Sequence, residues 1–198
     1  MRQDNKRILP ILLTTIMLFS AGCTQQNNST NKNPTTPSES TPEATVVATA
    51  EDTGTPITVG STITTNDMEI TINKAELTYD VLPDDTSGFY SHYEADAGNV
   101  YLHLDTNIKN LAKQNLSCDK LGTVTADYNG GYTYTGQAIP EDSTTGFTYA
   151  NITSIKPLET LGVHFIFKCP QEVAETQNPL FITFEPSNSS DRYIITIR

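Results

Sequence analysis

Hydrophobic and polar residues alternate most regularly over Val100–Asn110, with the sequence VYLHLDTNIKN. The even positions are mostly apolar, whereas the odd positions carry polar or amphipathic side chains. A period of two is typical of a β-strand that is buried on one face. This is the longest such run in the chain, so we predict that it sets the core of the domain and that other strands pair with it or pack on it.

Further strands are predicted on both sides of this run. In Leu161–Cys169 the apolar residues again occupy every second position, which predicts a second core strand. Met68–Tyr79 changes the parity of its apolar residues halfway, which predicts a β-bulge near Asn73 and Lys74. The other predicted strands are Ser61–Thr65, Asn115–Cys118, Gly122–Tyr128, Tyr132–Gly136, Phe147–Ile155, Leu180–Glu185 and Tyr193–Ile197, and Asn129-Gly130-Gly131 is the predicted hairpin turn.

Between these strands lie two segments without a regular pattern. Asp80–Asn99 is acidic and rich in turn residues, so we expect a long variable loop, and Ala138–Thr145 is expected to be irregular. Pro170–Asn178 has room for a short helical turn. Many short strands without a long helix predict an all-β fold, an immunoglobulin-like antiparallel β-sandwich over residues 57–198. A small closed barrel is the alternative.

The first 22 residues have the pattern of a secretory signal peptide. Basic residues precede the apolar run Ile8–Phe19, which has 12 residues, whereas a membrane-spanning helix needs about 20. The segment ends in Ser20-Ala21-Gly22-Cys23, which resembles the lipobox of bacterial lipoproteins. The resemblance implies that Cys23 carries a diacylglycerol and holds the chain at the extracytoplasmic face of the cell membrane. The alternative is an ordinary secreted protein that is cut nearby.

The composition changes between this segment and the predicted domain. Residues 23–56 are mostly Thr, Ser, Asn, Gln, Pro, Glu and Ala, so they bury too little apolar surface to offset the entropy of ordering. We therefore predict a disordered linker after the lipidated Cys23. The net charge of −11 argues against nucleic acid as a partner. The same charge suits a cationic ligand, or simply keeps the surface soluble.

Several strands and turns of the predicted domain resemble a family of bacterial extracytoplasmic domains. These are Val59–Ile63 before Met68–Ile72, the run YLHLDTNIKN, and KPLET before VHFIFKCP. They resemble the domain of unknown function 4352, which is related in fold to secreted mycobacterial immunoprotective antigens. The resemblance covers roughly residues 57–186 and implies an immunoglobulin-like domain carried by a lipoprotein, with no settled activity.

Few residues offer catalytic or metal-binding chemistry, and none lies in a recognisable nucleophile motif, so we predict no catalytic residue and no cofactor. His103 and Asp105 share the outward face of one strand, and His164 has outward parity on another. If these strands are neighbours, the three side chains approach metal-ligand geometry; otherwise they are polar residues on a half-exposed sheet.

Two further groups of side chains have the chemistry of binding sites. Acidic residues of the predicted loop offer oxygen ligands for Ca²⁺, or form a solvated loop: Asp80, Asp84, Asp85, Glu94 and Asp96. Tyrosines offer an adhesive surface, or simply cover the sheet: Tyr90, Tyr93, Tyr101, Tyr128, Tyr132 and Tyr134.

Two cysteines remain once Cys23 is lipidated. Cys118 and Cys169 both have core-facing parity, and outside the cytosol such a pair can form a disulfide. The alternative is two buried free thiols that pack as small hydrophobic side chains.

From these observations we expect a noncatalytic, membrane-anchored module. It would contact a protein, a glycan or a small ligand through the sheet face or the loop at residues 80–99. The alternative from another class is a metal-dependent enzyme or a metal-delivery lipoprotein that uses His103, Asp105 and His164.

Overall fold

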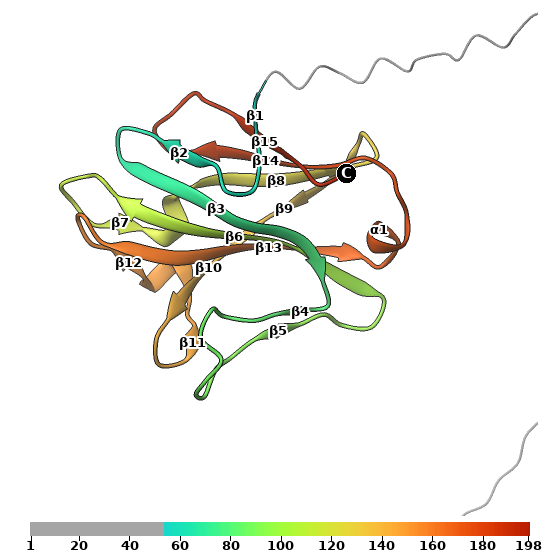
Figure 1. The fold of residues 1–198 in the computed structure, drawn as a ribbon, viewed down its shortest axis with the longest axis horizontal. Coiled ribbons are helices and arrows are strands. Elements are labelled where there is room, and N and C mark those ends of the chain that lie inside the picture. Colours follow the sequence, from blue (N-terminus) through green and yellow to red (C-terminus); the bar gives the residue numbers. More distant parts are fainter. Residues whose placement is uncertain (1–53) are drawn as a thin grey trace, which may run out of the picture. The chain divides into compact units, whose positions relative to one another are not determined.

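Two β-sheets packed face to face make up the part of the chain that the computed structural model describes, residues 54–198 (Figure 1). Cys23, the predicted signal peptide and nearly all of the predicted linker lie outside these residues. The five-stranded sheet has the order β1 (Thr55–Ile57), β15 (Tyr193–Thr196), β14 (Leu180–Pro186), β8 (Gly122–Tyr128) and β9 (Tyr132–Thr135). The six-stranded sheet has the order β11 (Gly146–Phe147), β10 (Gln137–Asp142), β13 (Thr160–Pro170), β6 (Asn99–Asn110), β3 (Met68–Thr78) and β2 (Thr62–Thr64).

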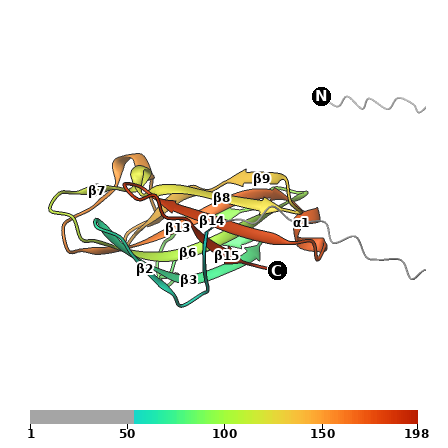
Figure 2. The same cartoon turned by 90° about the horizontal axis from the view of Figure 1, so that it is seen from above.

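Each of these sheets ends on both sides in an edge strand that pairs with one neighbour only, so the described residues form an immunoglobulin-like β-sandwich and not a closed barrel. All strand pairs in the two sheets are antiparallel except β1 with β15. Because β1 begins at Thr55, residues 55 and 56 belong to the first sheet and not to the predicted linker. Figure 2 shows the sandwich from a second side, with β8 and β9 along one side and β2 and β3 along the opposite one.

The central pair of the six-stranded sheet is the pair of strands with the strongest alternation in the sequence. β6 and β13 pair along eleven positions, from Thr160 opposite Lys109 to Pro170 opposite Asn99. Leu102, Leu104 and Phe167 are completely buried between the two sheets. Phe165 reaches across to Phe184 of β14, with ring centroids 5.8 Å apart. This contact joins the two sheets through the main core.

The predicted bulge in β3 is confirmed. The register of β3 against β6 shifts between Ile72 and Lys74, so Ile70 and Ile72 before the bulge face the main core, as does Leu77 after it. Without the extra residue one half of the strand would present its apolar side chains to the wrong face.

Asp80–Asn99 is more structured than predicted, because part of it forms the small two-stranded sheet of β4 (Asp80–Val81) and β5 (Tyr93–Glu94). We call residues 80–94 the flap. Val81 of the flap packs with Ile139, Phe147 and Ile166 in a second apolar cluster on the outer face of the six-stranded sheet. In Figure 1 the flap runs below this sheet, beside β11. The flap therefore adds a partial third layer.

Ala138–Thr145 also differs from its prediction, because β10 occupies much of it. Pro140 interrupts the apolar alternation there and has no N–H to donate. The strand tolerates it because β10 has only the two-residue β11 on its other side. The predicted strand at residues 147–155 is likewise broken into β11, the 3₁₀ turn Ala150–Ile152 and β12 (Ser154–Ile155), which pairs with β7 (Leu116–Ser117).

The predicted helical turn is α1 (Glu172–Glu175), and a second 3₁₀ turn covers Cys118–Lys120. Among residues 54–198, no helix has the length and apolar character that crossing a bilayer requires.

Candidate functional site

The three residues named as metal candidates from the sequence do lie together. β6 and β13 are neighbours, with His164 directly opposite Asp105 and Ile166 opposite His103. All three candidates face away from the main core, as their parity predicted. Their predicted exposure is wrong, because His103, Asp105 and His164 retain only 4%, 6% and 1% of their accessible surface.

The second apolar cluster explains this burial. Phe147 of β11 presents its ring to His164, with centroids 5.0 Å apart and planes at 77°. The flap is held over the same face: Ser91 donates its backbone N–H and its hydroxyl to the carbonyl oxygen of Thr145, each at 2.7 Å. The polar side chains thus lie under a cover and not on an open surface.

Both histidines are tied to each other. His103 Nε2 and His164 Nδ1 are 2.9 Å apart, and their rings stack with centroids 4.9 Å apart. Burial, followed by the neighbouring His164 and then by Lys74, lowers the pKa of His103 to about 3. His103 is therefore neutral at physiological pH, and its Nε2 can accept a hydrogen bond from the N–H at His164 Nδ1.

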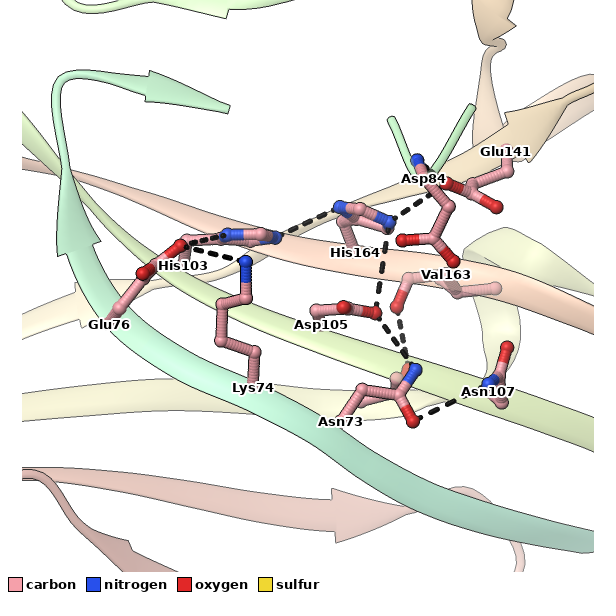
Figure 3. A network of polar contacts seen from close by, with 11 residues as sticks. Asn73, Lys74, Glu76, Asp84, His103, Asp105, Asn107, Glu141, Val163 and His164 are labelled. Carbon is pink, nitrogen blue, oxygen red and sulfur yellow. Dashed lines mark hydrogen bonds and ion pairs between the residues drawn. The ribbon is translucent and has the colours of Figure 1, made fainter. Parts of the chain in front are cut away.

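Each histidine has one buried ring nitrogen without a hydrogen bond, His103 Nδ1 and His164 Nε2. Both nitrogens have carboxylates near them but outside good hydrogen-bonding geometry (Figure 3). His164 Nε2 lies 3.3 Å from Glu141 Oε1 and 3.8 Å from Asp105 Oδ1. His103 Nδ1 lies 3.6 Å from Glu76 Oε1. Buried polar atoms are rarely left unsatisfied, so His164 Nε2 marks the point where a ligand is expected.

Asp84 of the flap completes the arrangement around His164. One carboxylate oxygen of Asp84, one carboxylate oxygen of Asp105 and one ring nitrogen of His164 all lie within 4.8 Å of one another. Asp84 itself is exposed, whereas the other two are buried. Its backbone N–H donates to Glu141 Oε1 at 2.7 Å, so this third carboxylate, from Glu141, both fixes the flap and approaches the histidine. We call Asp84, Asp105, Glu141 and His164 the acidic-histidine cluster.

Neighbouring residues hold the carboxylates of this cluster in place. Asn73, the extra residue of the bulge, donates from Nδ2 to Asp105 Oδ1 at 3.1 Å. Gly162 leaves room for Glu141, because a Cβ atom at position 162 would lie 2.5 Å from Glu141 Oε2. A bulge and a glycine that look like strand irregularities in the sequence thus position two of the acidic side chains.

Chemically, the cluster brings one imidazole nitrogen and the carboxylate oxygens of Asp84 and Asp105 within 4.8 Å of one another, and Glu141 Oε1 lies 3.3 Å from that nitrogen. Such a donor set suits a cation. His103 does not belong to the donor set, because its Nε2 contacts His164.

Sequence reasoning missed Glu141 and Asn73 and did not connect Asp84 to the histidines. Glu141 belongs to the segment predicted as irregular, so the sequence gives no strand parity for it. For Asp84 the sequence indicates only an acidic loop. The available signal was the parity of His103, Asp105 and His164, which pointed to the correct face of the sheet.

The other acidic candidates do not form one site. Asp80 Oδ1 is 2.6 Å from His92 Nδ1, Asp96 pairs with Lys168, and Asp85 accepts hydrogen bonds from Ser87. Asp84 alone among the five acidic candidates belongs to the cluster at His164.

The tyrosines likewise do not gather on one surface. Tyr93 and Tyr101 pack against the second apolar cluster, whereas Tyr128 is buried and Tyr134 packs against the main core. The packing of these four tyrosines agrees with the alternative that such residues simply cover the sheet.

Cys118 and Cys169 are both buried and both free thiols, so the disulfide considered from the sequence is absent and its alternative holds. Cys118 lines the same cavity as Phe165, and Cys169 is four residues beyond Phe165 on β13. Four strand residues span about 13 Å, whereas the Cα atoms of a disulfide lie within about 7 Å. The prediction that both cysteines face the core is correct, but the two residues lie at different positions along the length of the strands.

Comparison with known proteins gives a relative without an assigned activity. No family model and no curated protein matches the chain. A crystal structure of an uncharacterized β-sandwich protein from Clostridium difficile 630 is 44% identical, with a TM-score of 0.70, and the match covers 75% of this chain and 97% of that one. A conserved hypothetical protein from Bacillus anthracis is 12% identical with a TM-score of 0.45, covering 68% of this chain and 93% of that one. The yjhA protein from Bacillus subtilis is 12% identical with a TM-score of 0.41, covering 70% and 97%. At 44% identity over nearly the whole of the clostridial protein, the chain belongs to the family of that uncharacterized β-sandwich protein.

Proposed function

We propose that this chain is a lipid-anchored, extracytoplasmic module that binds a small cation in the acidic-histidine cluster and does not catalyse a reaction. The observation that carries the proposal is His164 Nε2, a buried nitrogen without a hydrogen bond that lies 3.3 and 3.8 Å from two carboxylate oxygens. Leaving such an atom unsatisfied costs about 1–3 kcal/mol, which a bound ion would offset.

Access to the cluster supports a small ligand. The side chains of His164 and Asp105 are 2% and 9% exposed, and that of Glu141 is 21% exposed. A glycan or a peptide does not reach donors that are covered to this degree, whereas an ion does. The flap, with Phe89 84% exposed, offers a separate outer surface for a larger partner.

The anchoring part of the proposal rests on the sequence. Small residues precede Cys23 at the end of an apolar run, and the following residues up to 53 are predicted to be a flexible tether. Membership in the domain of unknown function 4352 family is proposed on the strand and turn motifs alone. Together these features support a domain that stands on a lipid anchor outside the cytoplasm.

Thermal unfolding with different cations tests the binding function. We expect the full-length chain, stripped with a chelator, to unfold at a higher temperature with at least one of Mg²⁺, Ca²⁺, Mn²⁺ and Zn²⁺. At a concentration of 100 times Kd the gain is about 2.7 kcal/mol. Asp105→Asn should abolish the gain, because it removes the charge while the amide oxygen can still accept from Asn73. Glu172→Gln is the control, since it removes one exposed charge on α1. Equal unfolding temperatures with every cation would contradict the proposal.

A metal-dependent enzyme is the second candidate. The exposure of Asp84 favours this candidate. Asp105 and His164, which can share an ion with Asp84, are buried, so the cluster opens to solvent on the flap side. A catalytic metal needs such an open position for water or substrate.

A further inference from the structure

We propose, building on the cation-binding function, that the ion is a transition metal of the Zn²⁺ type and that it ties the flap to the sheet. Three elements would supply its ligands: Asp84 of the flap, Asp105 of β6 and His164 of β13. Glu141 of β10 lies beside them, with Oε1 3.3 Å from His164 Nε2.

The donor set selects the class of ion. Ca²⁺ and Mg²⁺ take oxygen ligands and leave imidazole unused. Zn²⁺, Co²⁺ and related ions combine imidazole nitrogen with carboxylate oxygen. Within the acidic-histidine cluster, the buried side-chain atom that has no hydrogen bond is the imidazole nitrogen His164 Nε2. An ion that ignored this nitrogen would leave it unsatisfied.

The spacing of the donor atoms agrees with this assignment. At the Zn–N and Zn–O bond lengths usual in proteins, neighbouring ligands of a tetrahedral ion lie about 3.3 Å apart. His164 Nε2 is 3.3 Å from Glu141 Oε1 and 3.8 Å from Asp105 Oδ1. These separations are poor for hydrogen bonds, but they are close to those of atoms that share one ion.

The residues behind the donors hold them as metal sites require. A ligating histidine usually donates a hydrogen bond from the N–H of its other ring nitrogen to a fixed acceptor. His164 Nδ1 has such a partner in His103 Nε2, which lies 2.9 Å away (Figure 3). Asp105 is held in the same way by the Asn73 amide. Lys74, the basic residue of this network, pairs with Glu76 on the far side of His103.

Asp84 makes the inference testable without damage to the fold. Its side chain is exposed, and the hydrogen bond that fixes the flap comes from its backbone N–H, so Asp84→Asn keeps that bond. Asp85→Asn is the matched control, because it removes the same charge from the next position of the same flap, and Asp85 is exposed as well.

The experiment is a binding titration of the chelator-stripped, full-length chain with Zn²⁺, Co²⁺ and Ca²⁺, with Co²⁺ also followed by its visible absorption. We expect one Zn²⁺ or Co²⁺ per chain and a tetrahedral Co²⁺ spectrum. Asp84→Asn should weaken binding at least about tenfold, and Asp85→Asn should leave it unchanged. His164→Gln should abolish the Co²⁺ spectrum.

Each other outcome has a defined meaning. Binding of Ca²⁺ in place of the transition metals would overturn this inference and leave the cation-binding function intact. Equal Zn²⁺ affinity in Asp84→Asn and Asp85→Asn would place the ion elsewhere and would also overturn it. Failure of every cation to bind would end both proposals.

Discussion

The thiols of Cys118 and Cys169 are chemically protected by the core. Burial raises the pKa of each thiol to about 11, and the thiolate is the form that reacts with alkylating agents. We therefore expect a Cys23→Ser chain at pH 8 to take up no iodoacetamide while native and to take up two labels in denaturant, as counted by mass spectrometry. The native reaction should speed up only as the pH approaches 11. One adduct on the native chain at pH 8 would show that a thiol is accessible.

For single residues, the sequence predicts the face to which a side chain points better than the groups that surround this side chain. The two-residue period of a strand fixes which side chains share a face, so the common face of His103, Asp105 and His164 was predictable. Their burial was not, because Val81 and Phe147 cover them from segments that were predicted as a loop and as a different strand. The same reasoning applies to Cys118 and Cys169, whose shared inward direction says nothing about their distance.

Close packing at Gly146 fixes the position of the flap. Gly146 has a φ of +80°, and a Cβ atom there would lie 2.9 Å from Tyr90 Cβ and 3.1 Å from the Ser91 carbonyl oxygen. Gly146→Ala should therefore push the flap outward and speed amide hydrogen exchange in residues 80–94, measured by mass spectrometry.

Gly130→Ala separates backbone strain from this contact. Gly130 also has a positive φ, +66°, but nothing lies within 4 Å of a Cβ atom at that position. The Gly130→Ala substitution should therefore leave amide hydrogen exchange in the flap unchanged. If both variants, or neither, altered exchange in residues 80–94, the packing explanation would be wrong.

Strands and turns were predictable where their own sequence carries a clear pattern. The parity change in Met68–Tyr79 located the bulge, and the Asn-Gly-Gly turn located the hairpin of β8 and β9. β10 was missed because Pro140 breaks its alternation, and β4 and β5 were missed because two residues are too few to show a period. These missed elements carry Glu141 and position Asp84, so the candidate site was predictable only in part.

The fold is stabilised in one part of the domain, and the candidate site lies in another. The main core between the sheets holds the fold together through contacts such as Phe165 with Phe184. The outer face of the six-stranded sheet, under the flap, holds polar groups that a stable sandwich does not need. Buried polar networks cost stability unless they are satisfied, so their presence on one covered face points to binding there.

Anchoring of the chain to the membrane depends on a single thiol in the proposed arrangement. In the native host we expect the protein to enter the detergent phase after Triton X-114 separation, and Cys23→Ala either to release it into the aqueous phase or to leave the precursor unprocessed with residues 1–22 attached. Two acyl chains on Cys23 would each add about 0.8 kcal/mol per buried methylene, which is enough for stable attachment. The chain itself has a net charge of −11, so we expect anionic lipid to repel it. Cys118→Ala is the control, because Cys118 is buried in the core and cannot be acylated in the folded chain.

Mass spectrometry of the mature N-terminus supplies an independent check. An unmodified N-terminus at a residue other than Cys23 would show that the chain is secreted without an anchor. The cation site would then act in a freely diffusing protein.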